Sequence, residues 1–352
     1  MIDLVLGGQY GSEGKGSVIQ WLAKKEGYDL VIRTGGSQAG HTMLFGGVNY
    51  KMRMLPCAWH TDSKLALSRQ AVVDKDVVMS ELKMVAEALG KPITEIPLYI
   101  SPSATLLEHT DSQEEKEAGL EKRIGSTTKG VGRARSRRIM RTARTVSQAT
   151  DELFLGWVRD YNEVLYNPES RILIESTQGW GLSLFGAYYP QCTSIDLNPY
   201  AILADAGIPW KLHKVRVIGV LRTFPIRVGG NSGELKCEIS WGTLRKIYGK
   251  HIRTERTTVT NRIRRVGFFE WDNARQFVAE CNPDFNVLTF ADYIQPGLLS
   301  FSEGDCILYS ELVDELKQYL ALVPKIKCLG VGIGKILLVR NARWSQDTKS
   351  ED

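Results

Sequence analysis

The sequence predicts one α/β domain with a mostly parallel central β-sheet flanked by helices. An apolar, strand-like run at residues 2–6 precedes a glycine-rich loop, and a second run at residues 30–33 precedes another that ends in Gly40-His41-Thr42. Further strand-like runs follow at residues 171–175 and 214–221. Strands alternating with helical segments are typical of parallel α/β sheets, which bind ligands at the carboxyl ends of their strands.

The first glycine-rich loop favours phosphate binding. Five glycines lie between residues 7 and 16, and the apolar residues that follow Ser17 predict a helix. Backbone N–H groups and the helix N-terminus would face a phosphate, with Lys15 as an added charge. The loop is not a Walker A motif, because Gly16 stands where that motif has serine or threonine. A plain strand–helix turn is the alternative, but a second such loop carrying His41 favours phosphate binding.

Composition predicts a cytoplasmic globular protein. The 352 residues are 43% hydrophobic and 24% charged, and the net charge of +5 is spread along the chain. A small anionic substrate explains this charge as well as nucleic acid does. The six cysteines form no CxxC pair, which indicates reduced thiols. No apolar run approaches a membrane span, so a membrane is not an expected partner. Nucleic acid is not an expected partner either, because the Lys and Arg residues are spread along the chain and form no basic tail.

The segment after the second loop predicts helices and one basic region. Residues 75–89 have helical periodicity, 98–101 read as a short strand, and 110–123 as a charged surface helix. The basic residues of 123–144 are either a solvated helix face or a nucleic-acid patch. No aromatic residue is interleaved to stack bases, which weakens the second interpretation.

The remainder of the chain shows no linker that would divide it. A helix is predicted near residues 311–322, and residues 342–352 form a polar tail that we expect to be disordered. A single domain is therefore predicted to span residues 1–341.

Motifs along nearly the whole chain resemble those of the adenylosuccinate synthetases. GQYGSEGKG and GGSQAGHT stand where that family carries GQWGDEGKG and GGHNAGHT, and RIGSTTKGVG, ESTQGWGLSL, RTFPIRVGG and TVTNRIRRVGFFEW follow in family order. The family joins aspartate to the 6-position of a purine nucleotide after a nucleoside triphosphate activates the 6-oxygen. The resemblance implies a P-loop-NTPase-like fold. It also marks one departure, because Ser12 stands at the position of the catalytic aspartate.

The resemblance places the triphosphate in the two glycine-rich loops. Lys15, His41 and Ser12 would be the catalytic residues, with His41 stabilising charge on the 6-oxygen or the transferred phosphoryl group. Mg²⁺ is the implied cofactor, held by the Ser12 side chain and the Gly40 carbonyl. The full implied set is Gly11, Ser12, Glu13, Gly14, Lys15, Gly16, Gly40, His41, Thr42, Thr289, Asp292 and Gly332.

The resemblance also implies a purine monophosphate site and a homodimer. Arg141 matches an arginine that crosses a two-fold interface to the monophosphate in the partner's active site. Arg133 and Arg137 replace a proline and an acidic residue of the family, which makes the rim of the site more basic. The implied residues are Ser12, Gln38, Ser126, Thr127, Arg141, Gln178, Thr193 and Arg262.

Residues 257–267 resemble the family's aspartate-binding loop. Arg262 and Arg264 are two apart, so an extended loop would project both guanidinium groups to one side. Forked guanidinium groups suit the two carboxylates of aspartate. The implied aspartate site is Thr258, Val259, Thr260, Arg262 and Arg264.

The segment 288–293 resembles the TKxD motif that reads the base of the triphosphate. Asp292 is kept, whereas Phe290 replaces the lysine. A phenyl ring stacks on any purine. We therefore expect ATP or dATP to serve as donor at least as well as GTP.

Ser12 favours dGMP as the acceptor. The family's aspartate accepts the N1–H of inosine monophosphate (IMP), and the 2-amino group of guanine would press against that carboxylate. Serine leaves room for this group, and the phage 2-aminoadenylosuccinate synthetases, which use dGMP, show the same replacement. The expected product is N6-succino-2-amino-2'-deoxyadenylate, made in the host cytoplasm if the chain is phage-encoded. Two alternatives stay open: a short adenylosuccinate synthetase using IMP and GTP, and a non-catalytic nucleotide-binding regulator.

Overall fold

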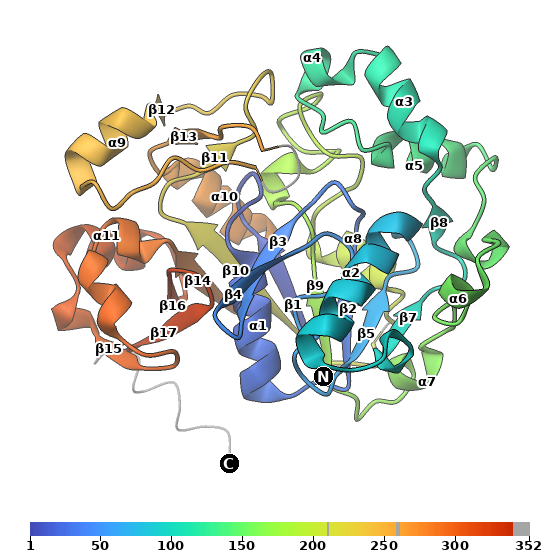
Figure 1. The fold of residues 1–352 in the computed structure, drawn as a ribbon. Helices are drawn as coiled ribbons and strands as arrows, with labels where there is room; N and C mark the ends of the chain where they lie inside the picture. Colours follow the sequence, from blue (N-terminus) through green and yellow to red (C-terminus); the bar gives the residue numbers. More distant parts are fainter. Residues whose placement is uncertain (210, 258–260, 341–352) are drawn as a thin grey trace.

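The computed structural model describes residues 1–209, 211–257 and 261–340, which are built around a ten-stranded sheet (Figure 1). Its neighbouring strands are parallel except for the antiparallel pair β16 and β17. The predicted mostly parallel α/β fold is therefore confirmed. In order across the sheet the strands are β15 (Cys306–Leu308), β17 (Lys335–Arg340), β16 (Ile326–Val331), β14 (Phe285–Thr289), β10 (Val215–Arg222), β1 (Ile2–Gly7), β9 (Ile172–Glu175), β2 (Leu30–Arg33), β5 (Lys64–Leu67) and β7 (Leu98–Ile100).

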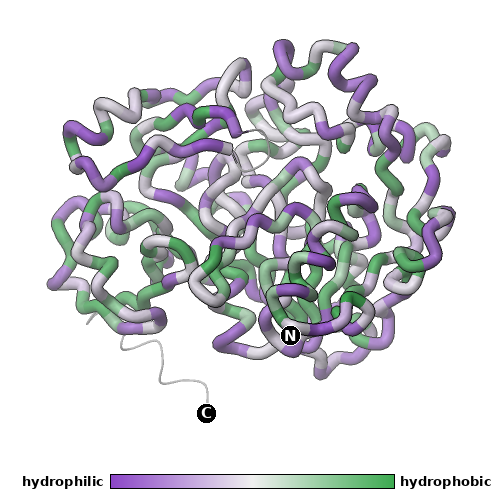
Figure 2. Tube along the Cα trace, viewed as in Figure 1, coloured by the Kyte–Doolittle hydropathy of each residue, from purple (hydrophilic) through white to green (hydrophobic). Residues whose placement is uncertain are grey.

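Two apolar cores lie against the two faces of this sheet, because successive side chains of a strand point to opposite faces. In β1, Val5 belongs to one core, whereas Leu4 and Leu6 belong to the other. Figure 2 shows the hydrophobic residues concentrated along the central strands and the hydrophilic ones on the outer segments. The first core includes α1 (Lys15–Glu26) and α2 (Lys75–Leu89), and the second includes α8 (Pro199–Ala206), α10 (Trp271–Cys281) and α11 (Asp314–Leu322).

Smaller units complete the described chain. Figure 1 shows α3–α5 and the group of α9 with β11–β13 at one end of the molecule. The strands are β3 (His41–Phe45), β4 (Val48–Met52), β6 (Val72–Val73), β8 (Thr105–Leu106), β11 (Ile226–Arg227), β12 (Glu238–Ile239) and β13 (Arg265–Gly267). The helices are α3 (His109–Glu117), α4 (Leu120–Ile124), α5 (Val131–Ile139), α6 (Glu152–Leu155), α7 (Asn162–Leu165) and α9 (Trp241–Tyr248). Short 3-10 turns cover Ile93–Glu95, Val146–Gln148, Trp180–Leu182, Ala291–Tyr293, Pro296–Ser300 and Tyr309–Glu311.

Several boundaries differ from the sequence-based predictions. The first helix begins at Lys15 rather than Ser17, because Gly14 has a left-handed backbone (φ 84°) and starts the helix directly. The helix predicted at 110–123 is two helices, α3 and α4, separated by Gly119 at φ 65°. No helix within the described residues is long and apolar enough to cross a membrane.

Candidate functional site

The loop between β1 and α1 is organised by the carboxylate of Glu13. This buried group accepts hydrogen bonds from the backbone N–H groups of Gln9 (3.2 Å) and Gly11 (2.7 Å). It also accepts one from Lys15 Nζ at 2.7 Å. Lys15, which is buried as well, donates a second hydrogen bond to the carbonyl of Gln178. The predicted phosphate-binding lysine is thus held at the loop by an internal carboxylate.

Gly16 explains why the loop departs from the Walker A pattern. A Cβ at this position would overlap the carbonyl oxygen of Thr42, so serine or threonine does not fit. The close approach sets the start of α1 against β3. It brings the helix N-terminus beside His41, which begins β3 instead of ending a loop.

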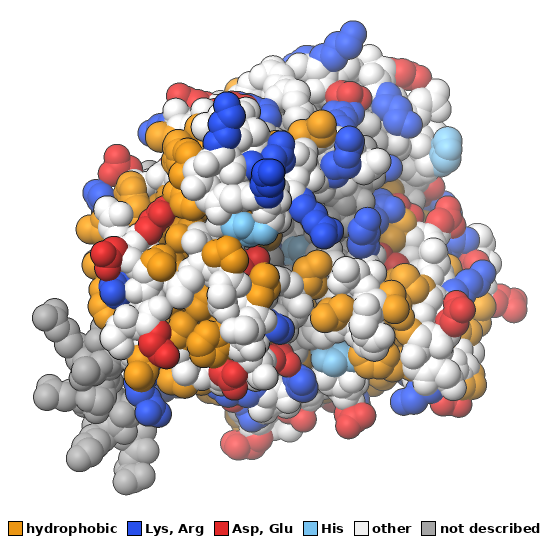
Figure 3. All heavy atoms as spheres, turned by 60° about the vertical axis from the view of Figure 1, so that its left-hand side comes forward, with side chains coloured by type: hydrophobic (Ala, Val, Ile, Leu, Met, Phe, Trp, Pro, Cys, Tyr) orange, Lys and Arg blue, Asp and Glu red, His pale blue; other side chains and the backbone are white. Residues whose placement is uncertain are grey.

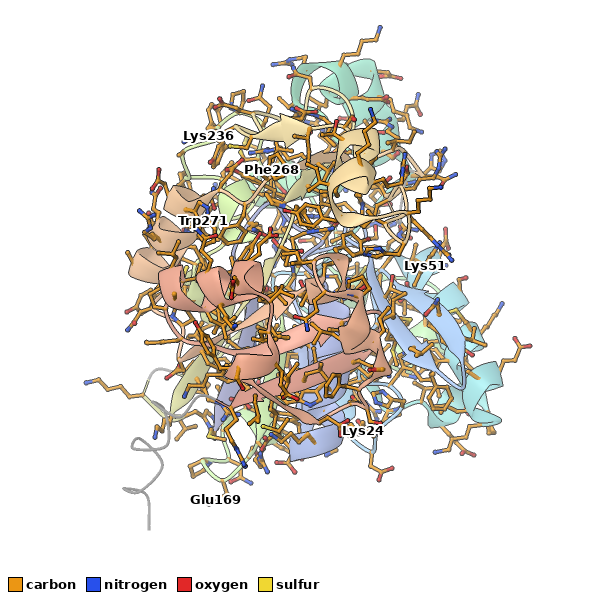
Figure 4. The ribbon with its side chains drawn as sticks, turned by 90° about the vertical axis from the view of Figure 1, so that its left-hand side faces the viewer. Lys24, Lys51, Glu169, Lys236, Phe268 and Trp271 are labelled. Atoms are coloured by element: carbon orange, nitrogen blue, oxygen red, sulfur yellow. The ribbon has the colours of Figure 1, made fainter. Side chains whose placement is uncertain are left out.

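A cleft of about 430 Å³ runs along this loop. Figure 3 shows Lys and Arg side chains gathered around a hollow in the surface, and the cleft is lined by Lys51, Arg256 and Arg264. Figure 4 shows Lys51 on the β3–β4 hairpin. All but one of the residues predicted for the triphosphate line this cleft, namely Ser12, Glu13, Gly14, Lys15, Gly16, Gly40, His41, Thr42, Thr289, Asp292 and Gly332. The exception, Gly11, lies against Gln178 instead.

His41 is fixed by a buried carboxylate and a buried arginine. Its Nδ1 lies 2.6 Å from Glu175 Oε1, and Arg33 forms an ion pair with the same carboxylate. Burial, helped by the charge of Arg33, lowers the pKa of His41 to about 4. The neutral ring donates through Nδ1–H to Glu175, which leaves a lone pair on Nε2. Burial by itself would raise the pKa of Glu175, but Arg33 and His41 outweigh it and hold the carboxyl ionised.

Sequence reasoning missed both Arg33 and Glu175. Each is the last residue of its strand, β2 and β9, and these two strands are adjacent and parallel in the sheet. A charged residue closing an otherwise apolar strand was the only signal.

A second cavity, of about 160 Å³, lies on the other side of the glycine-rich loop. Five residues predicted for the purine monophosphate line it together: Gln38, Ser126, Thr127, Gln178 and Thr193. Gln178 also connects the two cavities, since its carbonyl accepts the hydrogen bond from Lys15 of the cleft. The sequence assigned no role to Arg227, which lines this second cavity, is 2% exposed and stacks over the ring of Tyr10 at 3.9 Å.

The other predicted arginines lie elsewhere. Arg141 is exposed at the end of α5 with φ 61° and lines neither cavity. Arg262 pairs with Glu121 of α4 at 2.5 Å, whereas Arg264 lines the cleft and pairs with Glu255 at 2.9 Å. The two guanidinium groups, predicted to act side by side, are therefore held by carboxylates on different segments. The predicted aspartate-binding residues Thr258, Val259 and Thr260 lie outside the described residues.

Phe290 and Asp292 line the cleft beside the glycine-rich loop, where Phe290 lies against Gly14. Phe290 has a left-handed backbone (φ 59°), and the guanidinium of Arg222 lies 3.9 Å from the centre of its ring. Asp292 Oδ1 accepts a hydrogen bond from the N–H of Gly332 at 3.0 Å. Burial raises the pKa of Asp292.

Ser12 and Gly40 fit the divalent cation that the sequence resemblance implies. Both residues line the same cleft as Lys15, and Ser12 has a left-handed backbone (φ 60°). A hydroxyl and a carbonyl are hard oxygen ligands. Mg²⁺ usually takes few protein oxygens of this kind and completes its shell with phosphates and water.

Comparison with known proteins identifies the family to which the chain is similar. The profile of the adenylosuccinate synthetase family matches residues 4–157 and 154–296. An N6-succino-2-amino-2'-deoxyadenylate synthase of Vibrio phage phiVC8 is 34% identical over 310 residues, covering 84% of this chain and 87% of that protein. An adenylosuccinate synthetase of Methanococcus aeolicus is 38% identical over 280 residues, covering 78% and 79%.

Solved structures show the same fold. The cyanophage S-2L succinoaminodeoxyadenylate synthetase, bound to dGMP and dATP, has a TM-score of 0.79 at 24% identity, covering 98% of this chain and 97% of that one. The fully ligated adenylosuccinate synthetase of Plasmodium falciparum has a TM-score of 0.78 at 22% identity, covering 96% and 99%.

Proposed function

Since the chain belongs to the adenylosuccinate synthetase family, whose members are C–N bond-forming ligases, we propose that it joins L-aspartate to the 6-position of dGMP. ATP or dATP would be the phosphoryl donor, and N6-succino-2-amino-2'-deoxyadenylate the product. The single observation that carries the choice of dGMP is Ser12, at the position where the family has its catalytic aspartate.

Ser12 stands where the acceptor base meets the donor phosphates. It lines the cleft, and its neighbour Gly11 lies against Gln178, which lines the second cavity. A serine side chain is shorter than that of aspartate and carries no charge. It leaves space for the 2-amino group of guanine at the place where a carboxylate would crowd it.

The 6-oxygen would attack the γ-phosphate and release the nucleoside diphosphate, while the N1 proton passes to water because the Ser12 hydroxyl is a poor base. This transfer depends on charge and position. Mg²⁺ held by Ser12 and Gly40 would neutralise phosphate charge. The N-terminus of α1 and Lys15 line the donor cleft, where they favour a bound triphosphate. Phosphate negative charge would also raise the pKa of His41, which burial, Arg33 and Lys15 lower. His41 would then donate from Nε2 to the 6-oxygen or the transferred phosphoryl group, with Glu175 stabilising the imidazolium.

Aspartate would then attack carbon 6 and displace phosphate. Arg264 lines the cleft close to Ser12 and presents a guanidinium to a carboxylate. Arg262 is held at Glu121 on α4, a helix whose Leu120 and Ile124 line the second cavity. We propose that Arg264 binds a carboxylate of aspartate from the cleft, and that Arg262 contacts the nucleotide and aspartate from the side of the second cavity.

The donor base would stack on Phe290, with Asp292 facing its edge. Phe290 does not discriminate between purines, and Asp292 can accept a hydrogen bond from the 6-amino group of adenine. A donor site that binds adenine nucleotides also avoids inhibition by dGMP, which would compete for a donor site that prefers guanine.

The active form is proposed to be a homodimer in which Arg141 reaches the partner's monophosphate. Arg141 is exposed and follows two exposed apolar residues, Ile139 and Met140. Gly132 of the same helix lies against Ser194, and two further exposed aromatic residues, Phe185 and Tyr189, precede Ser194 in the chain. These two side chains are 84% and 72% exposed, as is typical of residues that a partner covers.

The deciding experiment offers dGMP and IMP in parallel. Purified protein with L-aspartate, ATP and Mg²⁺ is given either nucleotide, and the succinylated product is identified by mass spectrometry. We expect product from dGMP and little from IMP. Preference for IMP would identify an ordinary adenylosuccinate synthetase. Nucleotide binding without any product from either would identify a non-catalytic binder.

A further inference from the structure

We propose that Glu255 and Arg222 are positioning residues that hold Arg264 for a carboxylate of the aspartate substrate. This inference rests on the proposed function in one respect, namely that aspartate binds at Arg264. The sequence assigned no role to either residue.

Glu255 is the shared partner of three side chains at the edge of the cleft. Its Oε1 accepts hydrogen bonds from Arg222 Nη2 at 2.5 Å and from the hydroxyl of Tyr293 at 3.0 Å. Its Oε2 accepts from Arg264 Nη1 at 2.9 Å and from Arg222 Nη1 at 3.3 Å. Each carboxylate oxygen thus accepts two hydrogen bonds, so Glu255 is saturated and fixed. Burial by itself would raise the pKa of Glu255, but Arg222, Arg264 and Tyr293 together outweigh it and lower that pKa.

Arg222, Glu255 and Arg264 form a row of alternating charge that ends at the cleft with Arg264. Arg222 is fully buried, Glu255 and Arg264 are 14% and 12% exposed, and two guanidinium groups share one carboxylate. One unit of positive charge is therefore left over in this group. Within the described chain the Nε atoms of both arginines are buried without a hydrogen-bond partner, but only Arg264 of the two lines the cleft. A substrate carboxylate on Arg264 would complete the alternation of charge.

Arg222 anchors the row to the rest of the site. Its Nη1 donates to the carbonyl of Ser12 at 3.1 Å, and its guanidinium stacks on Phe290 at 3.9 Å. Through Glu255 and Arg222, the orientation of Arg264 is therefore fixed relative to Ser12, at the proposed acceptor base, and to Phe290, at the proposed donor base. Rigid support of this kind keeps a binding group in its productive geometry.

The test compares Glu255→Gln with the wild type, using whichever of dGMP or IMP the wild type converts. This choice separates failure of the inference from failure of the dGMP assignment, since aspartate is common to both reactions. We expect the KM for aspartate to rise about tenfold or more, with the KM values for both nucleotides changed less than threefold. Because Glu255 acts through Arg264, Glu255→Gln should have a smaller effect in an Arg264→Lys background than in the wild type. On a logarithmic scale, the rise in the aspartate KM should be less than half of the rise that Glu255→Gln causes alone.

Glu238→Gln is the matched control. Glu238 pairs at 2.5 Å with Arg265, the residue next to Arg264, but neither of them lines the cleft. Its aspartate KM should match the wild type. If Glu255→Gln does not fold, Glu255→Asp keeps the charge, withdraws the carboxylate by one methylene and should give a smaller rise in the same KM. The inference is overturned by equal rises in all three KM values, by an effect no larger than that of Glu238→Gln, or by full additivity with Arg264→Lys.

Discussion

Glu175 Oε1 and His41 Nδ1 lie 2.6 Å apart at the back of the donor cleft, joining the end of β9 to the start of β3. Burial of His41 beside Arg33, which outweighs this contact and lowers the pKa of His41, makes folding stability depend on pH. The folded pKa of His41 is about 4, below its ordinary 6.5, so the unfolded chain binds one more proton between these pH values. Folding stability is therefore full above pH 6.5 and falls as the pH drops toward 4. One proton corresponds to about 1.4 kcal/mol per pH unit.

The variant His41→Asn lacks the titrating imidazole, so it removes this difference in proton binding between the folded and unfolded chains. Urea unfolding at pH 7, 6 and 5 should show a shallower loss of stability in the variant than in the wild type. Parallel pH profiles would show that His41 titrates alike in the folded and unfolded chains.

Replacing Ser12 by aspartate should move acceptor use from dGMP toward IMP. The added carboxylate would crowd the 2-amino group and restore an acceptor for N1–H. We expect kcat/KM for dGMP to fall at least about tenfold, which corresponds to 1.4 kcal/mol. Ser12→Ala is the control, since it keeps the space and removes only the hydroxyl. If Ser12→Asp still prefers dGMP, the space at position 12 does not set the acceptor.

Each of Arg262→Ala and Arg264→Ala should weaken the use of aspartate. Each loses a charge-assisted contact worth about 1.5–3 kcal/mol, or roughly a tenfold to hundredfold rise in the KM for aspartate. Arg265→Ala is the control, because Arg265 pairs with Glu238 outside the cleft. An unchanged aspartate KM in both variants would move the carboxylate site elsewhere.

Mixing two inactive variants should restore activity if Arg141 crosses a dimer interface. Arg141→Ala and Lys15→Ala each disable a different half of a shared site, so a mixed dimer keeps one intact site of two. Random pairing of equal amounts gives about a quarter of the wild-type activity. Native mass spectrometry shows whether mixed dimers form. Mixed dimers without activity would place Arg141 in its own subunit's site.

Replacing Phe290 by lysine should raise the preference for GTP. The wild type is expected to use ATP or dATP at least as well as GTP, because Phe290 stacks on any purine. Initial rates with each triphosphate, at fixed acceptor and aspartate, give the ratio of kcat/KM values. A tenfold preference of the wild type for GTP, about 1.4 kcal/mol, would show that Asp292 outweighs Phe290.

The sequence was most informative where spacing is local. Strand β2 and helix α2 have the predicted bounds, because apolar periodicity and caps such as Asp74 and Gly90 act within a few residues. Most residues implied by the family motifs also line one cavity or the other. The partners that set their chemistry were not predictable, since Glu175 reaches His41 from 134 residues away and Arg222 reaches Ser12 from 210. Single buried charges of this kind carry no periodic signal.

The position of β1 in the sheet has a consequence for biosynthesis. This strand precedes both of its sheet neighbours in the chain, because it lies between β9 and β10, and its register pairs Ile2 with Ile172 and Val215. Its apolar residues therefore lack β9 as a sheet neighbour until residue 175 of 352 has been translated, and they lack β10 until residue 222. Such non-local pairing slows folding and exposes nascent apolar segments to association. A chain truncated before β9 lacks both neighbours of its central strand, so we expect it to require chaperones to remain dispersed.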